Sequence, residues 1–257
     1  MNRWRKPAGL AAAITLAALL PFSAFAGRFD GPFGRDSAQV WLVRPSGAPR
    51  CVVVFGHGWK VAPPSPAYPW VRQFLPWLDH LTAERCAVIF PRYQLGFGHA
   101  PGTALVDAFR RGIATGYARL GRPRLPVVAL GYSYGASLAL TYAANARRWH
   151  LAQPVAVDAV FPAGPIPGSP LPLLRPAIRV LIQVGDQDSE AGSAGAQAFW
   201  TWLASHPVTT KRYEIVSSHR GFAATHAAPK EATAAARAAF WAPLDALIAA
   251  TRSNRRR

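Results

Sequence analysis

Short apolar runs alternate with longer segments of helical pattern along most of this chain, and this alternation limits the folds open to it. The apolar runs lie at 51–55, 86–90, 126–130, 155–161, 178–184 and 211–216, with a more alternating run at 38–43. The segments of helical pattern lie at about 69–85, 103–120, 134–147, 193–205 and 230–250. Strands that are buried on both faces are continuously apolar and are joined by helical crossovers. The order therefore predicts an α/β fold, with about seven to eight mostly parallel strands and helices on both faces of the sheet.

The first 26 residues have the three parts of a secretory signal peptide. Residues 2–6 are basic, 8–20 are apolar, and Ala24-Phe25-Ala26 is a small-x-small cleavage site. The alternative is an uncleaved membrane anchor, for which the apolar run is short. Cleavage after Ala26 would leave one domain at 27–251 and a basic tail at 252–257, which we expect to be disordered. The pattern suits bacterial export, to either the periplasm or the medium.

The two cysteines, Cys51 and Cys86, each open a predicted strand. In an oxidising compartment two thiols more often form a bridge than remain free. If the two strands are neighbours, the bridge lies at the edge of the sheet opposite the carboxyl ends of the strands, and serves stability alone. Two buried free thiols are the alternative, because the geometry of a cross-strand bridge is demanding. No His or Cys pair has the spacing of metal ligands, so we expect neither a metal nor a cofactor.

The chain is strongly basic. Its formal net charge is +17, and removal of Arg3, Arg5 and Lys6 with the signal would leave 17 − 3 = +14. One interpretation is attraction to anionic envelope surfaces or acidic polymers. The other, which we favour, is a basic composition without a dedicated partner. Basic and aromatic residues do not interleave as in nucleic-acid-binding proteins, so we expect no nucleic-acid partner, and we expect a monomer.

The pentapeptide Gly131-Tyr132-Ser133-Tyr134-Gly135 lies between the apolar run 126–130 and a segment of helical pattern. This strand, G-x-S-x-G, helix order is typical of a nucleophile elbow, in which a sharp turn exposes the serine hydroxyl at the carboxyl end of a strand. The small residues two positions to either side let the strand and the helix approach closely. The pattern indicates that Ser133 is a nucleophile.

Four motifs in this order resemble the α/β-hydrolase superfamily. They are Gly56-His57-Gly58-Trp59, the pentapeptide at 131–135, Gly185-Asp186-Gln187-Asp188 and a late His219. Within the superfamily, the chain is most similar to esterases without a cap domain, such as dienelactone hydrolases and secreted polyester hydrolases. The resemblance spans about residues 36–248 and implies the α/β-hydrolase fold. Residues 28–35, where the first strand of that fold would lie, are too rich in Gly and Pro to predict a strand.

A serine nucleophile needs an acid and a histidine base, which follow it in this superfamily in the order Ser, Asp or Glu, His. The acidic residues that we considered are Asp158, Asp186, Asp188, Glu190 and Glu214. Asp188 is preferred, because it follows the run 178–184 after a turn and so lies at the carboxyl edge of the sheet. Asp186 is the second choice, and Asp158 lies in the middle of its predicted strand.

For the base we considered His206, His219 and His226. His206 ends a predicted helix on the side of the sheet away from Ser133. His219 comes three residues after the last predicted strand, on a loop of small residues that returns over the carboxyl edge. His219 is therefore the preferred base, and His226 is the alternative if the loop folds back.

Two backbone N–H groups are expected to bind the oxyanion. One is that of Tyr134, directly after the nucleophile, and the resemblance assigns the other to Trp59. His57, next to Gly58, is expected to brace that turn through hydrogen bonds to the backbone. Aromatic residues that are candidates for a substrate wall lie nearby, at Trp59, Tyr68, Trp70, Tyr93, Tyr132 and Tyr134.

The segment 161–178 is short and rich in proline, and it leaves no room for a cap domain. An open site follows, which suits small or polymeric esters. The resemblance implies a serine hydrolase that cleaves carboxylic esters through an acyl-enzyme on Ser133. The alternatives are a peptidase, thioesterase or acyltransferase with the same residues, or a hydrolase-like binding protein without activity.

Overall fold

The computed structural model describes residues 27–59, 70–94 and 102–253. The predicted signal peptide, Tyr68 and residues 254–257 lie outside these residues. Within them, no helix is both long enough and apolar enough to cross a membrane.

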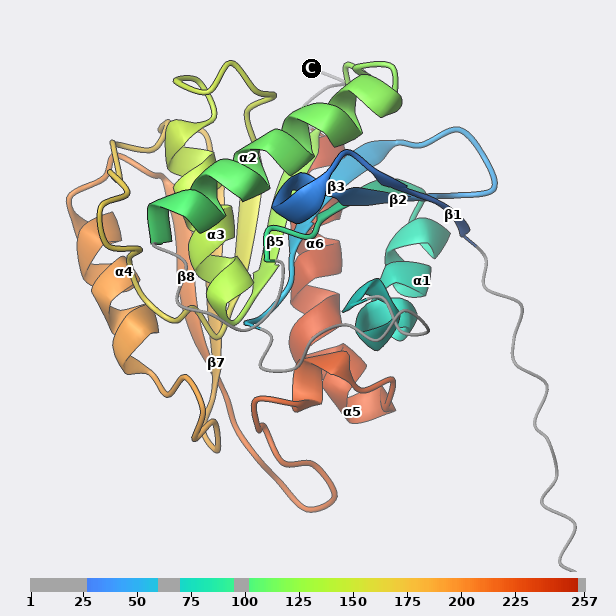
Figure 1. Ribbon diagram of the computed structural model, residues 1–257. Helices are drawn as coiled ribbons and strands as arrows, with labels where there is room; N and C mark the ends of the chain where they lie inside the picture. Colours follow the sequence, from blue (N-terminus) through green and yellow to red (C-terminus); the bar gives the residue numbers. More distant parts are fainter. Residues whose placement is uncertain (1–26, 60–69, 95–101, 254–257) are drawn as a thin grey trace, which may run out of the picture.

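Eight strands of the described residues form one sheet, in the order β1-β2-β4-β3-β5-β6-β7-β8 (Figure 1). They are β1 (Arg28–Phe33), β2 (Val40–Arg44), β3 (Cys51–Gly56), β4 (Cys86–Pro91), β5 (Val127–Tyr132), β6 (Ala156–Val160), β7 (Arg179–Gly185) and β8 (Thr210–Val216). All neighbours from β4 to β8 in this order are parallel, whereas β2 pairs antiparallel with both β1 and β4. The predicted mostly parallel sheet is confirmed.

The prediction that residues 28–35 form no strand is wrong. β1 pairs with β2, and the register shifts between Asp30 and Phe33, where Gly31 adopts a φ of 121°. An irregularity at the edge of a sheet accommodates both this glycine and the following proline. Proline has no N–H to donate, and at such a position the sheet loses no hydrogen bond between strands. Asp30 also accepts a hydrogen bond of 2.8 Å from Nε of Arg44, on β2.

The helices cover both faces of the sheet (Figure 1). Their bounds are α1 (Leu75–Ala83), α2 (Gly102–Arg119), α3 (Tyr134–Asn145), α4 (Ala194–Ala204), α5 (Ala234–Ala236) and α6 (Ala242–Ser253), with short turns η1 (Asp36–Ala38), η2 (Trp70–Phe74), η3 (Ala228–Lys230) and η4 (Arg237–Trp241). α2, α3 and α4 lie on one face, and α1 and α6 lie on the other. α6 extends to Ser253, two residues into the segment predicted as a tail.

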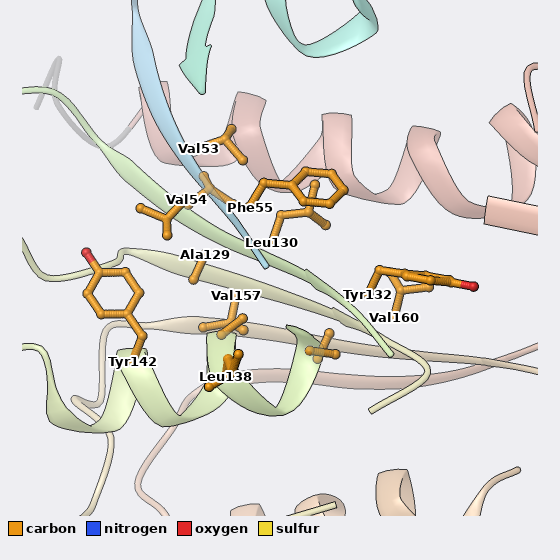
Figure 2. Packing of buried hydrophobic residues seen from close by; sticks show 14 of the residues in the cluster. Val53, Val54, Phe55, Ala129, Leu130, Tyr132, Leu138, Tyr142, Val157 and Val160 are labelled. Atoms are coloured by element: carbon orange, nitrogen blue, oxygen red, sulfur yellow. The ribbon is translucent and has the colours of Figure 1, made fainter. Parts of the chain in front are cut away.

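The core consists of two apolar layers, one on each face of the sheet. Figure 2 shows Leu138 and Tyr142 of α3 on the side of Ala129 and Val157, whereas Phe55 and Leu130 point to the opposite side. Every one of these side chains is fully buried. Successive side chains of each central strand thus point into opposite apolar layers, which explains why the central strands are apolar throughout.

Cys51 and Cys86 form a disulfide, as predicted. They are paired in register as the first residues of the parallel strands β3 and β4, with their Cα atoms 4.6 Å apart. Both are fully buried at the amino ends of their strands. The bridge therefore lies at the edge of the sheet opposite Ser133.

Loss of this bridge should lower stability and leave the chemistry intact. The two cysteines are 35 residues apart, and the chain-entropy model gives a loop of that size about 3–4 kcal/mol of stabilisation. We expect the variant with both Cys51→Ala and Cys86→Ala to melt at a lower temperature but to keep, at 15 °C, the initial rate of the ester hydrolysis that the sequence predicts. Thermal melts with and without reductant are the measurement. An equal melting temperature for the wild type under both conditions would contradict the prediction.

Asp158 is a polar residue at the centre of the sheet. It lies in register between Leu130 of β5 and Leu181 of β7 and is fully buried. Neither of its carboxyl oxygens has a hydrogen-bond partner among the described residues. Burial raises the pKa of Asp158 well above its ordinary value, so the group is held neutral in the folded protein. Its place within the strand agrees with its exclusion from the candidate site.

Replacing Asp158 should stabilise the protein, and more so at neutral than at acidic pH. Above pH 3.8, the ordinary pKa of aspartate, the unfolded chain gains free energy by ionising this group while the folded protein keeps it neutral, so stability falls as pH rises. We expect Asp158→Val to raise the free energy of unfolding at pH 7 by about 1–3 kcal/mol, and by less at pH 4. Urea denaturation at both values measures this.

Asp158→Asn is the matched control for that prediction. Asparagine cannot ionise, but it leaves an unpaired polar group in the core. Asp158→Asn should therefore remove the contribution of this residue to the pH dependence of stability, and should raise the free energy of unfolding less than Asp158→Val does. A wild type that is more stable than Asp158→Val at pH 7 would show that the carboxyl group has a stabilising role.

Candidate active site

Ser133 forms the turn between β5 and α3. Its backbone has φ 57° and ψ −128°, a conformation that is strained for a residue with a side chain. Two hydrogen bonds of 2.8 Å hold the turn, from the N–H of Ser133 to the carbonyl of Val160 and from the N–H of Ala136 to the carbonyl of Ser133. Ser133 is half-buried at the carboxyl end of β5. The expected elbow is therefore present.

The glycines of the motif are required by the close approach of three segments. A Cβ atom at Gly131 would overlap the backbone of Gly135 and Ala136, and one at Gly135 would overlap the carbonyl groups of Gly56 and His57. The turn after β3 therefore packs directly on the start of α3. A Cβ at Gly58 would lie 3.2 Å from that of Ser133, so this turn borders the serine.

Asp188 lies after β7 on a turn at the same edge of the sheet. Its Oδ1 accepts hydrogen bonds from the backbone N–H groups of Glu190 (2.9 Å) and Ala191 (3.2 Å). Both carboxylate oxygens lie 3.1 Å from Nδ1 of His226. The side chain is 0% exposed, and its direction is fixed by the two backbone donors.

His226 is held next to the elbow by aromatic residues. Its ring packs against those of Tyr132, 5.0 Å away, and Phe161, 5.2 Å away. The hydroxyl of Tyr132, the residue before Ser133, donates a hydrogen bond of 2.6 Å to the carbonyl of His226. Burial, and then the charges of Glu190 and Asp188, raise the pKa of Tyr132 well above its ordinary value, so the phenol remains a donor. The second ring nitrogen, Nε2, lies 3.8 Å from Oε2 of the exposed Glu190.

His219, the preferred base of the sequence analysis, does not approach Asp188, and this assignment needs correction. His219 and Phe222 form an isolated antiparallel bridge around Arg220-Gly221, with Gly221 at a φ of 85°. The side chain of His219 is exposed, and its Nδ1 lies 3.1 Å from the carbonyl of Arg220. The hairpin turns the chain back, so the histidine that contacts Asp188 is the alternative, His226. Gly221 is the residue that a turn with a positive φ at its third position favours, and it could have indicated this hairpin.

The remaining acid and base candidates have other contacts. Asp186 accepts hydrogen bonds from the backbone N–H of Ser218 (2.8 Å) and from its hydroxyl (2.5 Å). His206 is buried at the end of α4, where its Nδ1 lies 2.7 Å from the carbonyl of Trp202. His206 thus caps a helix on the far side, as expected.

The turn after β3 is braced from within. The ring nitrogens of the buried His57 lie 2.7 Å from the carbonyl of Gly58 and 2.6 Å from that of Arg92. The hydroxyl of Tyr93 donates to the carbonyl of His57 at 2.5 Å. These are contacts to the backbone of the kind expected for His57. Tyr93 and Tyr132 thus brace the backbone below the site, and neither is exposed enough to form a substrate wall.

Among the candidate aromatic residues whose side chains the structure describes, Trp59 and Tyr134 are half-buried. Their rings meet edge to face, 5.3 Å apart. The N–H of Tyr134 is the first of α3, so the positive end of the helix dipole lies beside Ser133. In residues 27–59, 70–94 and 102–253, no three His, Cys, Asp or Glu side chains come together as metal ligands would.

No protein-family model and no curated protein matches the sequence. Solved structures do match the fold. Esterase B from Lactobacillus rhamnosis is 13% identical, with a TM-score of 0.64 over 89% of this chain and 86% of that chain. MGS-M1, an α/β-hydrolase enzyme from a Medee basin deep-sea metagenome library, is 12% identical, with a TM-score of 0.61 over 86% of this chain and 96% of its own.

A third similar structure is that of the carboxylesterase Cest-2923 from Lactobacillus plantarum WCFS1. It is 14% identical, with a TM-score of 0.60 over 85% of this chain and 94% of that chain. At such low identity these matches concern the backbone fold alone, and they agree with the mostly parallel sheet and its covering helices. The chain has the α/β-hydrolase fold.

Proposed function

We propose that this chain is a serine hydrolase that cleaves carboxylic esters, with Ser133 as nucleophile, His226 as base and Asp188 as the acid that orients the base. The observation that carries the proposal is the 3.1 Å contact between Asp188 and Nδ1 of His226, beside a serine in a strained turn. A buried carboxylate at Nδ1 selects the tautomer in which Nε2 is free to accept a proton. The esterases among the similar structures support the choice of esters.

Each residue has one role in the proposed reaction. Ser133 Oγ attacks the ester carbonyl carbon while its proton passes to Nε2 of His226, and a tetrahedral intermediate forms. The intermediate expels the alcohol, which takes the proton from His226, and leaves an acyl group on Ser133. A water molecule then attacks the acyl carbon and gives a proton to His226, which returns it to Ser133 as the acid product leaves.

The N–H groups of Tyr134 and Trp59 are the proposed oxyanion donors. Support comes from the position of Tyr134 at the start of α3 and from the contact of the β3 turn with the elbow at Gly58 and Ser133. Donors fixed by backbone packing need no reorganisation when negative charge develops on the substrate oxygen. His57, below this turn, is then a support for the donors and takes no part in proton transfer.

We propose an open site for small or polymeric esters. The connection from β6 to β7, residues 161–178, contains neither a helix nor an inserted domain. This absence of a cap supports the similarity to dienelactone hydrolases and secreted polyester hydrolases as the closer subtype. Substrate entry then needs no movement of a cap over Ser133.

We also propose that the chain is exported and that residues 1–26 are removed. The disulfide between Cys51 and Cys86 supports an oxidising compartment. The periplasm and the medium both meet this condition.

Ser133→Ala should abolish hydrolysis of p-nitrophenyl acetate, by at least about 10³-fold in kcat, because no other group can form the acyl-enzyme. The mature wild type should be labelled covalently by a fluorophosphonate, and the variant should not, as measured by intact mass. An unchanged far-UV spectrum serves as the folding control. A folded variant that keeps the wild-type rate would refute Ser133 as the nucleophile.

The two histidines of the return loop should differ sharply in their effect on turnover. His226→Ala should lower kcat by about 10³-fold or more, since Ser133 then has no base. His219→Ala, the matched control seven residues earlier, should stay within about threefold of the wild type, as is usual for an exposed surface residue. The reverse order of effects would restore His219 as the base.

A further inference from the structure

The chain leaves β8 at the carboxyl edge of the sheet and extends beyond it as a short hairpin before it reaches His226 (Figure 1). His219 and Phe222 exchange two backbone hydrogen bonds of 2.9 Å across the turn at Arg220-Gly221. These bonds close the tip of the hairpin but do not connect it to the sheet. The position of His226 therefore depends on contacts at the base of the hairpin.

Asp186 makes those contacts. Its own N–H donates to the carbonyl of Val216 at 3.0 Å and continues the pairing of β7 with β8 by one residue. Its Oδ1 accepts the hydroxyl of Ser218 at 2.5 Å, and its Oδ2 accepts the backbone N–H of the same residue at 2.8 Å. Ser218 Oγ in turn accepts the N–H of Ala224 at 2.9 Å. One carboxylate thus connects both arms of the hairpin to the end of β7.

The second arm also packs on the strand end directly. A Cβ atom at Gly185 would overlap the carbonyl group of Ala224, so the backbone of Ala224 lies against the residue before Asp186. His226 follows two residues later, and its ring meets Asp188. The two aspartates of Gly185-Asp186-Gln187-Asp188 therefore hold two points of the same loop, Ser218 at its start and His226 at its end.

We propose that Asp186 is a positioning residue, which fixes the return hairpin through Ser218 so that His226 is held between Asp188 and Ser133. This inference rests on the proposed serine hydrolase function. The hydrogen bonds from the hydroxyl and the backbone of Ser218 lower the pKa of the exposed Asp186. Its carboxylate is therefore ionised, and remains an acceptor for both bonds, throughout the pH range in which a histidine acts as base.

The first test compares Asp186→Ala, Ser218→Ala and the double variant. A misplaced base raises the barrier of the chemical step and has little effect on substrate binding. We therefore expect kcat to fall by about 10- to 100-fold for each single variant, with KM within about twofold. The double variant should lose no more than the worse single variant, because both remove the same connection. Ser218→Thr, which retains the hydroxyl, should restore most of kcat, and Gln187→Ala is the matched control between the two aspartates.

The second test does not depend on turnover. A proton shared between Nδ1 of His226 and Asp188 gives a downfield proton resonance, which His226→Ala identifies by its loss. This resonance should be present in the wild type, in Gln187→Ala and in Ser218→Thr, and should be weakened or lost in Asp186→Ala. Melting temperatures of all variants are measured alongside.

Three results would overturn the inference. They are a kcat of Asp186→Ala within twofold of the wild type, additive losses in the double variant, or a loss of activity that merely follows the fraction of unfolded protein at the assay temperature. Failure of the proposed function looks different, because the wild type would then resist the fluorophosphonate. The resonance of His226 would still decide whether Asp186 positions it.

Discussion

The close backbone approach of β3, β5 and α3 is the constraint on which the rest of the site depends. Gly131 and Gly135 leave no room for a side chain, and the carbonyl groups of Gly56 and His57 occupy the space where a Cβ of Gly135 would lie. This packing forces the sharp turn at Ser133 and brings the β3 turn beside it. Strain at Ser133 is tolerated because buried strands and a buried helix fix the backbone on both sides.

The parallel sheet places the candidate site and the disulfide at opposite edges. Strands that run in one direction present all their carboxyl ends at one edge, where Ser133, Asp188 and His226 lie. Their amino ends meet at the other edge, where the disulfide joins the first residues of β3 and β4. A change in the bridge therefore acts on the stability of the fold, whereas a change at the carboxyl edge acts on the geometry of the candidate site.

The return loop after β8 leaves the sheet before it brings His226 back, so contacts outside the strand ladder must hold it. Two carboxylates compensate for this. Asp188 holds the imidazole, and the hydrogen bonds of Asp186 to Ser218 hold the base of the hairpin. Tyr132, at the end of β5, adds a third anchor through the hydrogen bond from its hydroxyl to the carbonyl of His226. Interactions from β5 and β7 thus converge on one histidine.

The sequence by itself predicted the order of the central strands along the chain, the turn at Ser133, the position of Asp188 at the carboxyl edge of the sheet and the pairing of Cys51 with Cys86. Each of these depends on local pattern or on the ends of predicted strands. The sequence did not reveal β1, since a Gly-Pro irregularity is tolerated only at the edge of a sheet. Only the tertiary structure shows that His226, and not His219, contacts Asp188. Both histidines follow β8 closely, and the choice depends on the hairpin at Arg220-Gly221, whose base is fixed by Asp186, a residue distant in sequence.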